Sequence, residues 1–233
     1  MRRISEGMPG GQDVRAIEVG ERLWAIVQSV PESDYSETAL ARGLQNLDWV
    51  GPRAIAHERV IESFLSSRAL LPMPLFTLFT SDDRAVQHVQ SDGARIRRLL
   101  TRVEGKVEWG LRLTFDEKAA RTEVSNRRVT SGTEFLARKR DVLAISRARL
   151  KEVQTAADRV HKSMSRLATA ARRRTSLERA APGSRLLLDA AFLIPAGKSG
   201  AFRSAVRQQT RGLKAAGIAV SLTGPWPAYN FIE

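Results

Sequence analysis

The stretch Ala196-Gly197-Lys198-Ser199 is the part of this 233-residue chain whose residue types come nearest to a reaction site, because Gly-Lys-Ser ends the phosphate-binding loop of many nucleotide-binding proteins. That loop needs a glycine five positions before its Gly-Lys-Ser, so that backbone amides can surround the phosphates. Phe192 stands there in this chain. We therefore interpret the stretch as a plain turn from a strand into a helix, and we expect no nucleotide cofactor.

The remaining reactive residue types form no recognisable catalytic or metal-binding pattern. The three histidines, His57, His88 and His161, lie far apart in the sequence, and the chain has no cysteine. The absence of cysteine excludes disulfides, thiolate metal sites and cysteine nucleophiles. No serine lies in a Gly-x-Ser-x-Gly motif. The sequence therefore predicts a protein that is not an enzyme, with no catalytic residue, no cofactor and no metal.

Basic residues are the most unusual feature of the composition. The formal net charge is +13, and the stretch from Arg84 to Arg185 alone holds 25 Lys and Arg against 11 Asp and Glu. Such an excess favours acidic partners, which are nucleic acid, an acidic protein or an anionic membrane surface, although charge runs are most often a solvated helix surface. Few aromatic residues lie between Phe135 and Phe192, which counts against base stacking. Candidate anion contacts are Arg127-Arg128, Arg138-Lys139-Arg140 and Arg172-Arg173-Arg174.

The C-terminal segment carries three large aromatic side chains on a stiff backbone. A short apolar run, Ile218 to Leu222, predicts a strand, and Pro225 and Pro227 then prevent both a central strand and a helix. The aromatic tail, residues 223–233, presents Trp226, Tyr229 and Phe231. Aromatic groups of this size are usually buried, so we expect the tail to dock on its own domain or on a partner.

A long helix is predicted over residues 132–177, since no glycine or proline occurs between Gly132 and Pro182. An apolar stripe recurs there every seven residues, which predicts a heptad-bearing helix that projects, folds back or pairs with another helix. The stripe consists of Leu136, Leu143, Leu150, Ala157, Met164 and Ala171, joined on the companion heptad position by Val153, Val160 and Leu167. Before it, Val107 to Phe115 alternates as a half-buried strand does, with Glu108 pointing away from the core. After it come an apolar strand over 185–195, a helix over 199–216 and the final strand.

The first hundred residues predict a smaller set of elements. Ile17 to Val19 and Leu23 to Val27 are typical of two short strands, and a helix follows Pro52. Leu75 to Phe79 predicts a further strand. Thr80-Ser81-Asp82-Asp83 is typical of a helix start, and the helix it opens is expected to be interrupted by Gly93 and to end near Gly105. The whole order predicts an α+β fold.

Several of these pieces, in order along the chain, resemble the GvpL/GvpF family of gas vesicle proteins. The terminal strand followed by Gly224-Pro225-Trp226-Pro227 is similar to the ending of that family. The internal pieces that resemble it are Leu71–Phe76, Gly105–Gly110, Gly132–Lys139 and Phe192–Pro195 with Phe202 after it. The chain departs from the family at its start, where Met1-Arg2-Arg3-Ile4 stands in place of the usual aromatic strand, so the sheet is expected to be one strand short or the start trimmed.

The resemblance implies two domains. They are an N-terminal α+β domain over 1–105 and a modified ferredoxin-like C-terminal domain over 106–233, which includes the long helix and the tail. It also implies an accessory or minor structural protein of gas vesicle assembly, located in the cytoplasm and at the gas vesicle. Its implied partners are the hydrophobic shell protein GvpA and other gas vesicle accessory proteins.

Two hypotheses for function follow. The first is this assembly protein, with partner-binding residues Trp226, Tyr229 and Phe231 on the tail and Arg138 and Arg140 on the long helix. The alternative is a nucleic-acid-binding protein that uses the basic central helix. The two differ in salt dependence, because phosphate contacts weaken steeply as salt is added whereas apolar contacts do not.

Overall fold

The computed structural model describes residues 6–116, 132–175 and 183–232, and within the long helix it describes side chains from residue 144 onward. The fold is mixed α/β, and it divides into two compact units. The N-terminal unit holds Met1–Gly105 together with Trp226–Glu233, and the C-terminal unit holds Lys106–Pro225. The division falls after Gly105, and residues 226–233 of the aromatic tail belong to the N-terminal unit rather than to the unit that precedes them in sequence.

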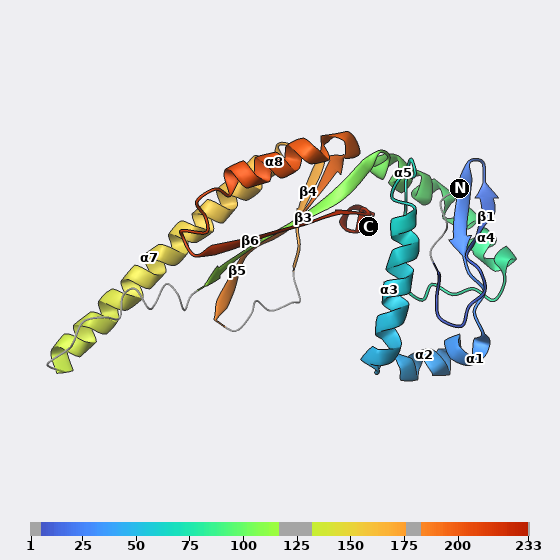
Figure 1. Ribbon diagram of the computed structural model, residues 1–233, viewed down its shortest axis with the longest axis horizontal. Helices are drawn as coiled ribbons and strands as arrows, with labels where there is room; N and C mark the ends of the chain where they lie inside the picture. Colours follow the sequence, from blue (N-terminus) through green and yellow to red (C-terminus); the bar gives the residue numbers. More distant parts are fainter. Residues whose placement is uncertain (1–5, 117–131, 176–182, 233) are drawn as a thin grey trace. The chain divides into compact units, whose positions relative to one another are not determined.

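The N-terminal unit joins a two-stranded antiparallel sheet to a set of helices (Figure 1). Its elements are β1 (Arg15–Gly20), β2 (Leu23–Val27), α1 (Glu32–Tyr35), α2 (Glu37–Gly43), α3 (Leu47–Ser63), α4 (Asp82–Ser91), α5 (Gly93–Val103) and the short helix η2 (Tyr229–Phe231). The Ser81 side chain accepts a hydrogen bond from the Arg84 amide at 3.3 Å, which caps α4 where the sequence predicts a helix start.

The helical stretch from Asp82 toward Gly105 is interrupted next to Gly93, as the sequence predicts, and α4 and α5 are separate helices that meet there. Another expectation for this unit is wrong. Leu75 to Phe79 is not a strand. Phe76 there has a φ of +63°, a left-handed conformation that no regular strand contains.

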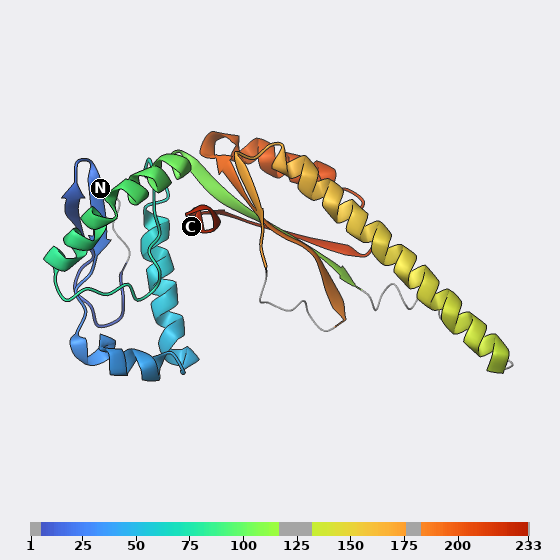
Figure 2. The same cartoon turned by 180° about the vertical axis from the view of Figure 1, so that it is seen from behind.

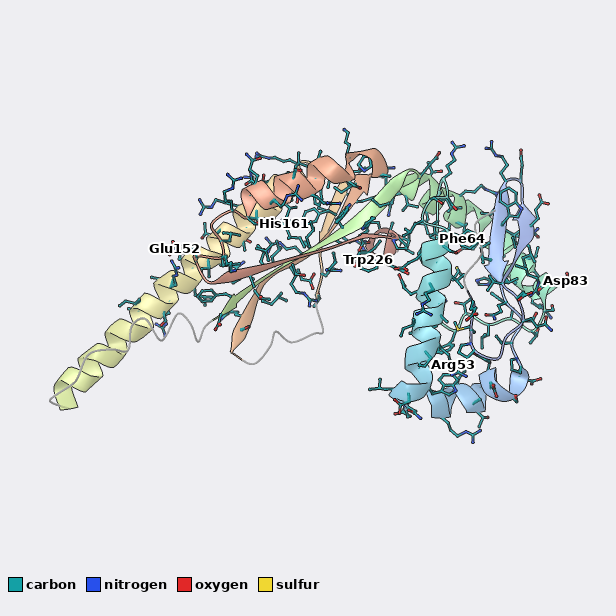
Figure 3. All side chains as sticks on the ribbon, viewed as in Figure 1. Arg53, Phe64, Asp83, Glu152, His161 and Trp226 are labelled. Carbon is teal, nitrogen blue, oxygen red and sulfur yellow. The ribbon has the colours of Figure 1, made fainter. Side chains whose placement is uncertain are left out.

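Three aromatic rings and the buried Arg53 side chain form a cluster in the N-terminal unit. The Trp49 and Phe76 rings lie 5.5 Å apart, and the Tyr35 ring lies 6.2 Å from Trp49. Arg53, which projects from α3 in Figure 3, places its guanidinium carbon 3.9 Å from the centre of the Trp49 ring. Its Nη1 donates to the Trp49 carbonyl at 3.0 Å. The guanidinium is therefore held by an aromatic face and by one backbone carbonyl, while its buried Nε has no hydrogen-bond partner among the described residues.

The C-terminal unit is a four-stranded sheet in the order β4-β5-β3-β6. Its elements are β3 (Lys106–Asp116), α7 (Gly132–Ser165), β4 (Ala170–Arg173), β5 (Ser184–Pro195), the short helix η1 (Ala196–Lys198), α8 (Ser199–Gln209) and β6 (Ile218–Trp226). β3 and β4 both pair with β5 in antiparallel fashion. Figures 1 and 2 show α7 and α8 on one face of this sheet.

The long helix is shorter than the sequence predicts. α7 ends at Ser165 rather than at 177, and Ala170–Arg173 form strand β4. β4 lies against β5 with Ala171 opposite Phe192 and Arg173 opposite Ala190, and this tertiary pairing overrides a helical pattern that has no glycine or proline to end it.

The apolar stripe of α7 faces the sheet where its side chains are described. Val153, Ala157, Val160 and Met164 are buried in the core with residues of β3, β5 and α8. The N-terminal part of the helix extends past the sheet (Figure 1), and Ile145 on it is 52% exposed.

The alternating apolar side chains of β3, Trp109, Leu111, Leu113 and Phe115, are buried as the sequence predicts, but part of the other face of the strand is buried as well. Glu108 is only 2% exposed, although the alternation placed it outside the core. The neighbouring strand β5 is also buried along most of its length. In contrast, β6 lies at the edge of the sheet, where Pro225 removes no interior ladder bond.

Candidate partner-binding surfaces

The aromatic tail bonds to helices of its own unit. The Tyr229 hydroxyl donates to Glu58 Oε2 on α3 at 2.6 Å. Arg102 Nη1 on α5 donates to the Phe231 carbonyl at 3.3 Å. Phe231 itself is 4% exposed and Ala228 3%. A partner could reach the Phe231 ring only by displacing the tail from the N-terminal unit.

The other predicted contact residues are placed differently. Trp226, labelled in Figure 3, ends β6 and is partly exposed. Arg138 and Arg140 lie in the N-terminal part of α7, and their side chains fall outside the described residues. The structure therefore does not bring Trp226, Tyr229 and Phe231 together with the two arginines into a described site.

Two arginines of the 172–174 cluster are engaged in ion pairs within the C-terminal unit. Arg173 Nη2 lies 2.6 Å from Asp158 Oδ1 on α7, and this bond is the main reason that the pKa of Asp158 is lowered. Arg174 Nε donates to Asp189 Oδ1 at 2.8 Å. These two side chains therefore stabilise contacts within the sheet and between the sheet and α7. They do not form a row of available phosphate contacts.

Asp189 is a buried carboxylate shared by two arginines. It is 5% exposed, and Arg112 Nη2 donates to its second oxygen at 2.9 Å. The register of the sheet explains the contact, because Arg112 on β3 stands directly opposite Asp189 on β5. The Arg174 amide also donates to the Asp189 carbonyl at 2.8 Å, so the chain after β4 is held to β5 by backbone and side chain together. These contacts therefore stabilise the sheet by linking β3, β5 and the chain that follows β4.

The Ala196–Ser199 stretch and the other residues considered for a reaction site do not form a catalytic or metal-binding group among the described residues. Ala196–Lys198 form η1, the turn from β5 into α8, and the Ser199 hydroxyl accepts a hydrogen bond from Trp109 Nε1 at 3.2 Å. Among the residues that the structure describes, no group of three or more His, Asp and Glu side chains could hold a metal ion. No described helix combines the length and apolarity required to cross a membrane.

The histidines have separate packing roles. His57 Nε2 lies 3.1 Å from the Met73 carbonyl, and the His88 ring lies 5.2 Å from that of Phe79. His161 on α7 packs 5.9 Å from the Phe192 ring, and its buried Nε2 has no hydrogen-bond partner among the described residues (Figure 3). Burial, with the nearby Arg173 charge, lowers the pKa of His161.

Exposed apolar side chains that the sequence pattern did not predict lie on α3 and at the cap that follows α2. Leu44 is 55% exposed, Leu47 86% and Ile55 54%. Leu47 and Ile55 are eight residues apart and so lie on one side of α3, with Gly51 between them and open space around its Cα. Ile55 belongs to a helical apolar pattern, which by itself predicts burial. Leu47 directly follows the helix cap Asn46, and this position could have indicated an exposed first turn.

Comparison with known proteins gives a consistent result over the whole chain. The family model "Gas vesicle synthesis protein GvpL/GvpF" matches residues 2–233. The chain is 33% identical to "Gas vesicle protein L" of Streptomyces sp. (strain CB03234), over 95% of this chain and 84% of the relative. The crystal structure of GvpF from Anabaena sp. PCC7120 is similar with a TM-score of 0.68 at 16% identity, over 98% of this chain and 91% of that one. GvpF from Microcystis aeruginosa is similar with a TM-score of 0.65 at 12% identity, over 94% and 88%.

Proposed function

Because the chain belongs to the GvpL/GvpF family of gas vesicle proteins, we propose that it is a non-enzymatic accessory or minor structural protein of gas vesicle assembly. It acts in the cytoplasm, at the forming gas vesicle. The family match over residues 2–233 is the observation that supports this role most strongly.

The partner in this proposal is the hydrophobic shell protein GvpA, captured before it assembles, together with other gas vesicle accessory proteins. An apolar subunit of that kind needs a partner surface that presents apolar side chains to it. The exposed side chains of Leu47 and Ile55 on α3 offer such a surface, and Leu44 at the cap after α2 is exposed as well. Gly51 leaves room for a partner backbone to approach between Leu47 and Ile55.

The tail and α7 have secondary roles in the same proposal. Trp226 is a second apolar contact, whereas Tyr229 and Phe231 act by holding the tail on the N-terminal unit. Arg138 and Arg140 contact acidic groups of a partner from the part of α7 that extends past the sheet. In domain terms, we propose that the unit from 106 is a modified ferredoxin-like domain whose long helix carries the heptad stripe. The support is its order of strand, helix, strands, helix and strand.

Co-purification with GvpA tests the proposal. The two proteins are expressed together, and the complex is recovered with nuclease added and with salt varied. We expect a complex that survives nuclease and moderate salt, since apolar contacts are not screened as charge contacts are. Recovery of nucleic acid in place of GvpA, lost when salt is added, would refute the assembly role.

A matched pair of variants locates the contact. Ile55→Asp places a charge on the α3 face, and Ile145→Asp places the same charge on a side chain of nearly equal exposure, 54% against 52%, on α7. We expect Ile55→Asp to abolish recovery of GvpA and Ile145→Asp to retain it. Equal recovery by both variants would move the contact away from α3. Trp226→Ala measures the contribution of the tail in the same assay.

A further inference from the structure

Exposed cations follow one another along α8 and the turns after it, in a stretch that we call the basic segment, residues 198–214. Arg203 and Arg207 are four residues apart, so they lie on one side of the helix, about 6 Å apart along its axis. Lys198 precedes the helix, and Arg211 and Lys214 are exposed in the hydrogen-bonded turns that follow it.

The core of the C-terminal unit holds α8 in place on one face of the sheet (Figure 1). Phe202 and Val206 are each 2% exposed, and they pack the helix on that core. Arg203 and Arg207 follow these two residues by one position and are both exposed. The guanidinium carbon of Arg203 lies 6.0 Å from the centre of the Trp109 ring, a distance at which cation–π attraction is weak. The two arginines therefore stand on a fixed helix at a defined spacing.

The positive charge of the basic segment has no internal counterpart. Between Asp189 and Glu233 the sequence contains five Lys and Arg and no Asp or Glu. None of these five cations forms an ion pair within the described part of the chain. Arg207 Nη2 donates a hydrogen bond of 3.0 Å to Ser204 Oγ, which carries no net charge.

The neighbouring helix α7 does not neutralise the segment either. Its described side chains include two acidic residues, Glu152 and Asp158. Glu152 is paired with Arg149 at 3.0 Å, and Asp158 with Arg173 at 2.6 Å. Both carboxylates of the described part of α7 are therefore already engaged with other cations.

The stability of α8 does not explain where its cations lie. The N-terminal end of a helix carries partial positive charge and favours acidic residues there. The first turn of α8 has none, and Lys198 occupies the N-cap position. Arg207, in the last turn, suits the negative end of the helix, whereas Lys198 opposes the positive end. An anionic partner would offset that cost and the repulsion between Arg203 and Arg207.

The composition of the segment identifies the class of anion. Phe202 is its only aromatic residue and is buried, so a nucleic-acid base would find no ring on which to stack. The apolar face of α8 is buried in the core, so the helix has none to insert into a membrane surface. A second copy of this chain would carry the same net charge of +13 and would be repelled. These features favour the carboxylates of a different protein.

We propose that Arg203 and Arg207 of α8 bind an acidic helical segment of a partner protein. Carboxylates four positions apart on the partner helix have the same spacing as the two guanidiniums, each of which can hold a carboxylate with two parallel hydrogen bonds. Arg211 and Lys214 add attraction at the end of the helix. This contact goes beyond the capture of GvpA, because it lies in the C-terminal unit and depends on charge rather than on the apolar side chains of α3.

The test uses the full chain and a fluorescently labelled, alanine-based helical peptide with glutamates every four positions, followed by fluorescence anisotropy at low salt. Arg203→Ala combined with Arg207→Ala should weaken binding about tenfold, since two exposed ion pairs are lost. The matched control combines Arg147→Ala with Lys151→Ala, which removes the same charge from two exposed positions four residues apart on α7. We expect the control to change affinity less than about twofold.

A charge exchange separates a direct contact from an effect on the fold. Arg203→Glu combined with Arg207→Glu should lose the glutamate peptide. The same variant should bind a peptide with lysine in place of each glutamate more tightly than the native chain does, because the new carboxylates now face cations. A variant that gains no affinity for the lysine peptide would overturn the proposal.

Two further results would also overturn it. One is equal weakening by the α7 control and by the α8 variant, which would mean that only overall charge attracts the peptide. The other is tighter binding of a single-stranded oligonucleotide of the same net charge, or of phosphatidylserine vesicles, with that binding lost in Arg203→Ala/Arg207→Ala but not in the control. Such a result would assign the two arginines to nucleic acid or to a membrane surface.

Discussion

Replacing Asp189 by alanine should destabilise the C-terminal unit by about 3 kcal/mol, because it leaves two arginines without their shared carboxylate. The Asp189 side chain is 2% exposed, whereas those of Arg112 and Arg174 are 35% and 30% exposed. Removing one partner of a fully buried pair costs roughly 3–5 kcal/mol. We place the cost at the lower end of that range, since the two guanidiniums can regain part of their hydration.

Urea unfolding followed by tryptophan fluorescence measures this cost. Trp109 is 4% exposed and lies in the C-terminal unit. A variant of the protein in which Trp109 is the only tryptophan therefore reports the unfolding of that unit alone. With an m-value of about 2 kcal/mol per molar urea, a loss of about 3 kcal/mol lowers the midpoint by about 1.5 M.

The matched control is Asp158→Ala. It removes an Arg–Asp pair of the same unit whose side chains are both 50% exposed. Such a pair contributes about 1 kcal/mol or less, so the midpoint should fall by no more than about 0.5 M. Equal shifts for Asp158→Ala and Asp189→Ala would show that burial of the carboxylate does not determine the cost, and the reasoning would fail.

Three further outcomes are expected. Phe231→Ala should destabilise the N-terminal unit by about 3 kcal/mol, because a buried ring is lost; an unchanged urea midpoint would mean that the tail is only loosely held. The lowered pKa of His161, caused first by burial and then by Arg173, means that the unfolded chain binds its proton more readily. Stability should therefore fall as the pH drops below about 6.5, and His161→Leu should flatten the dependence of the urea midpoint on pH. Gly110→Ala should cost about 1–2 kcal/mol, since its new carbon would lie 2.7 Å from Thr223 Oγ1, and adding Thr223→Ala should recover most of that loss in the same urea assay.

The sequence by itself determined the mixed α/β class, the family and most of the elements. The strands at 107–115 and 185–195 were predictable because their sequences are alternating or continuous apolar runs. A strand with one or both faces buried needs such a run wherever it lies in the fold. The start of α4 could also be predicted from nearby residues, because the Ser81 side chain caps the helix that directly follows it. The resemblance to GvpL/GvpF rested on short motifs in order along the chain, and the match over residues 2–233 confirms it.

Only the tertiary structure decided the end of α7 and the fate of the tail. No glycine or proline between Ser165 and Pro182 forbids a helix, and β4 exists because Ala170–Arg173 pair with β5 and because Asp189 attracts Arg174. The tail belongs to the N-terminal unit through Glu58 and Arg102, which are 171 and 129 residues away from their tail partners in the sequence. A sequence pattern reports the local preference of each residue. It does not report which distant group will satisfy a buried charge or cover an aromatic ring, and those long-range choices placed both segments.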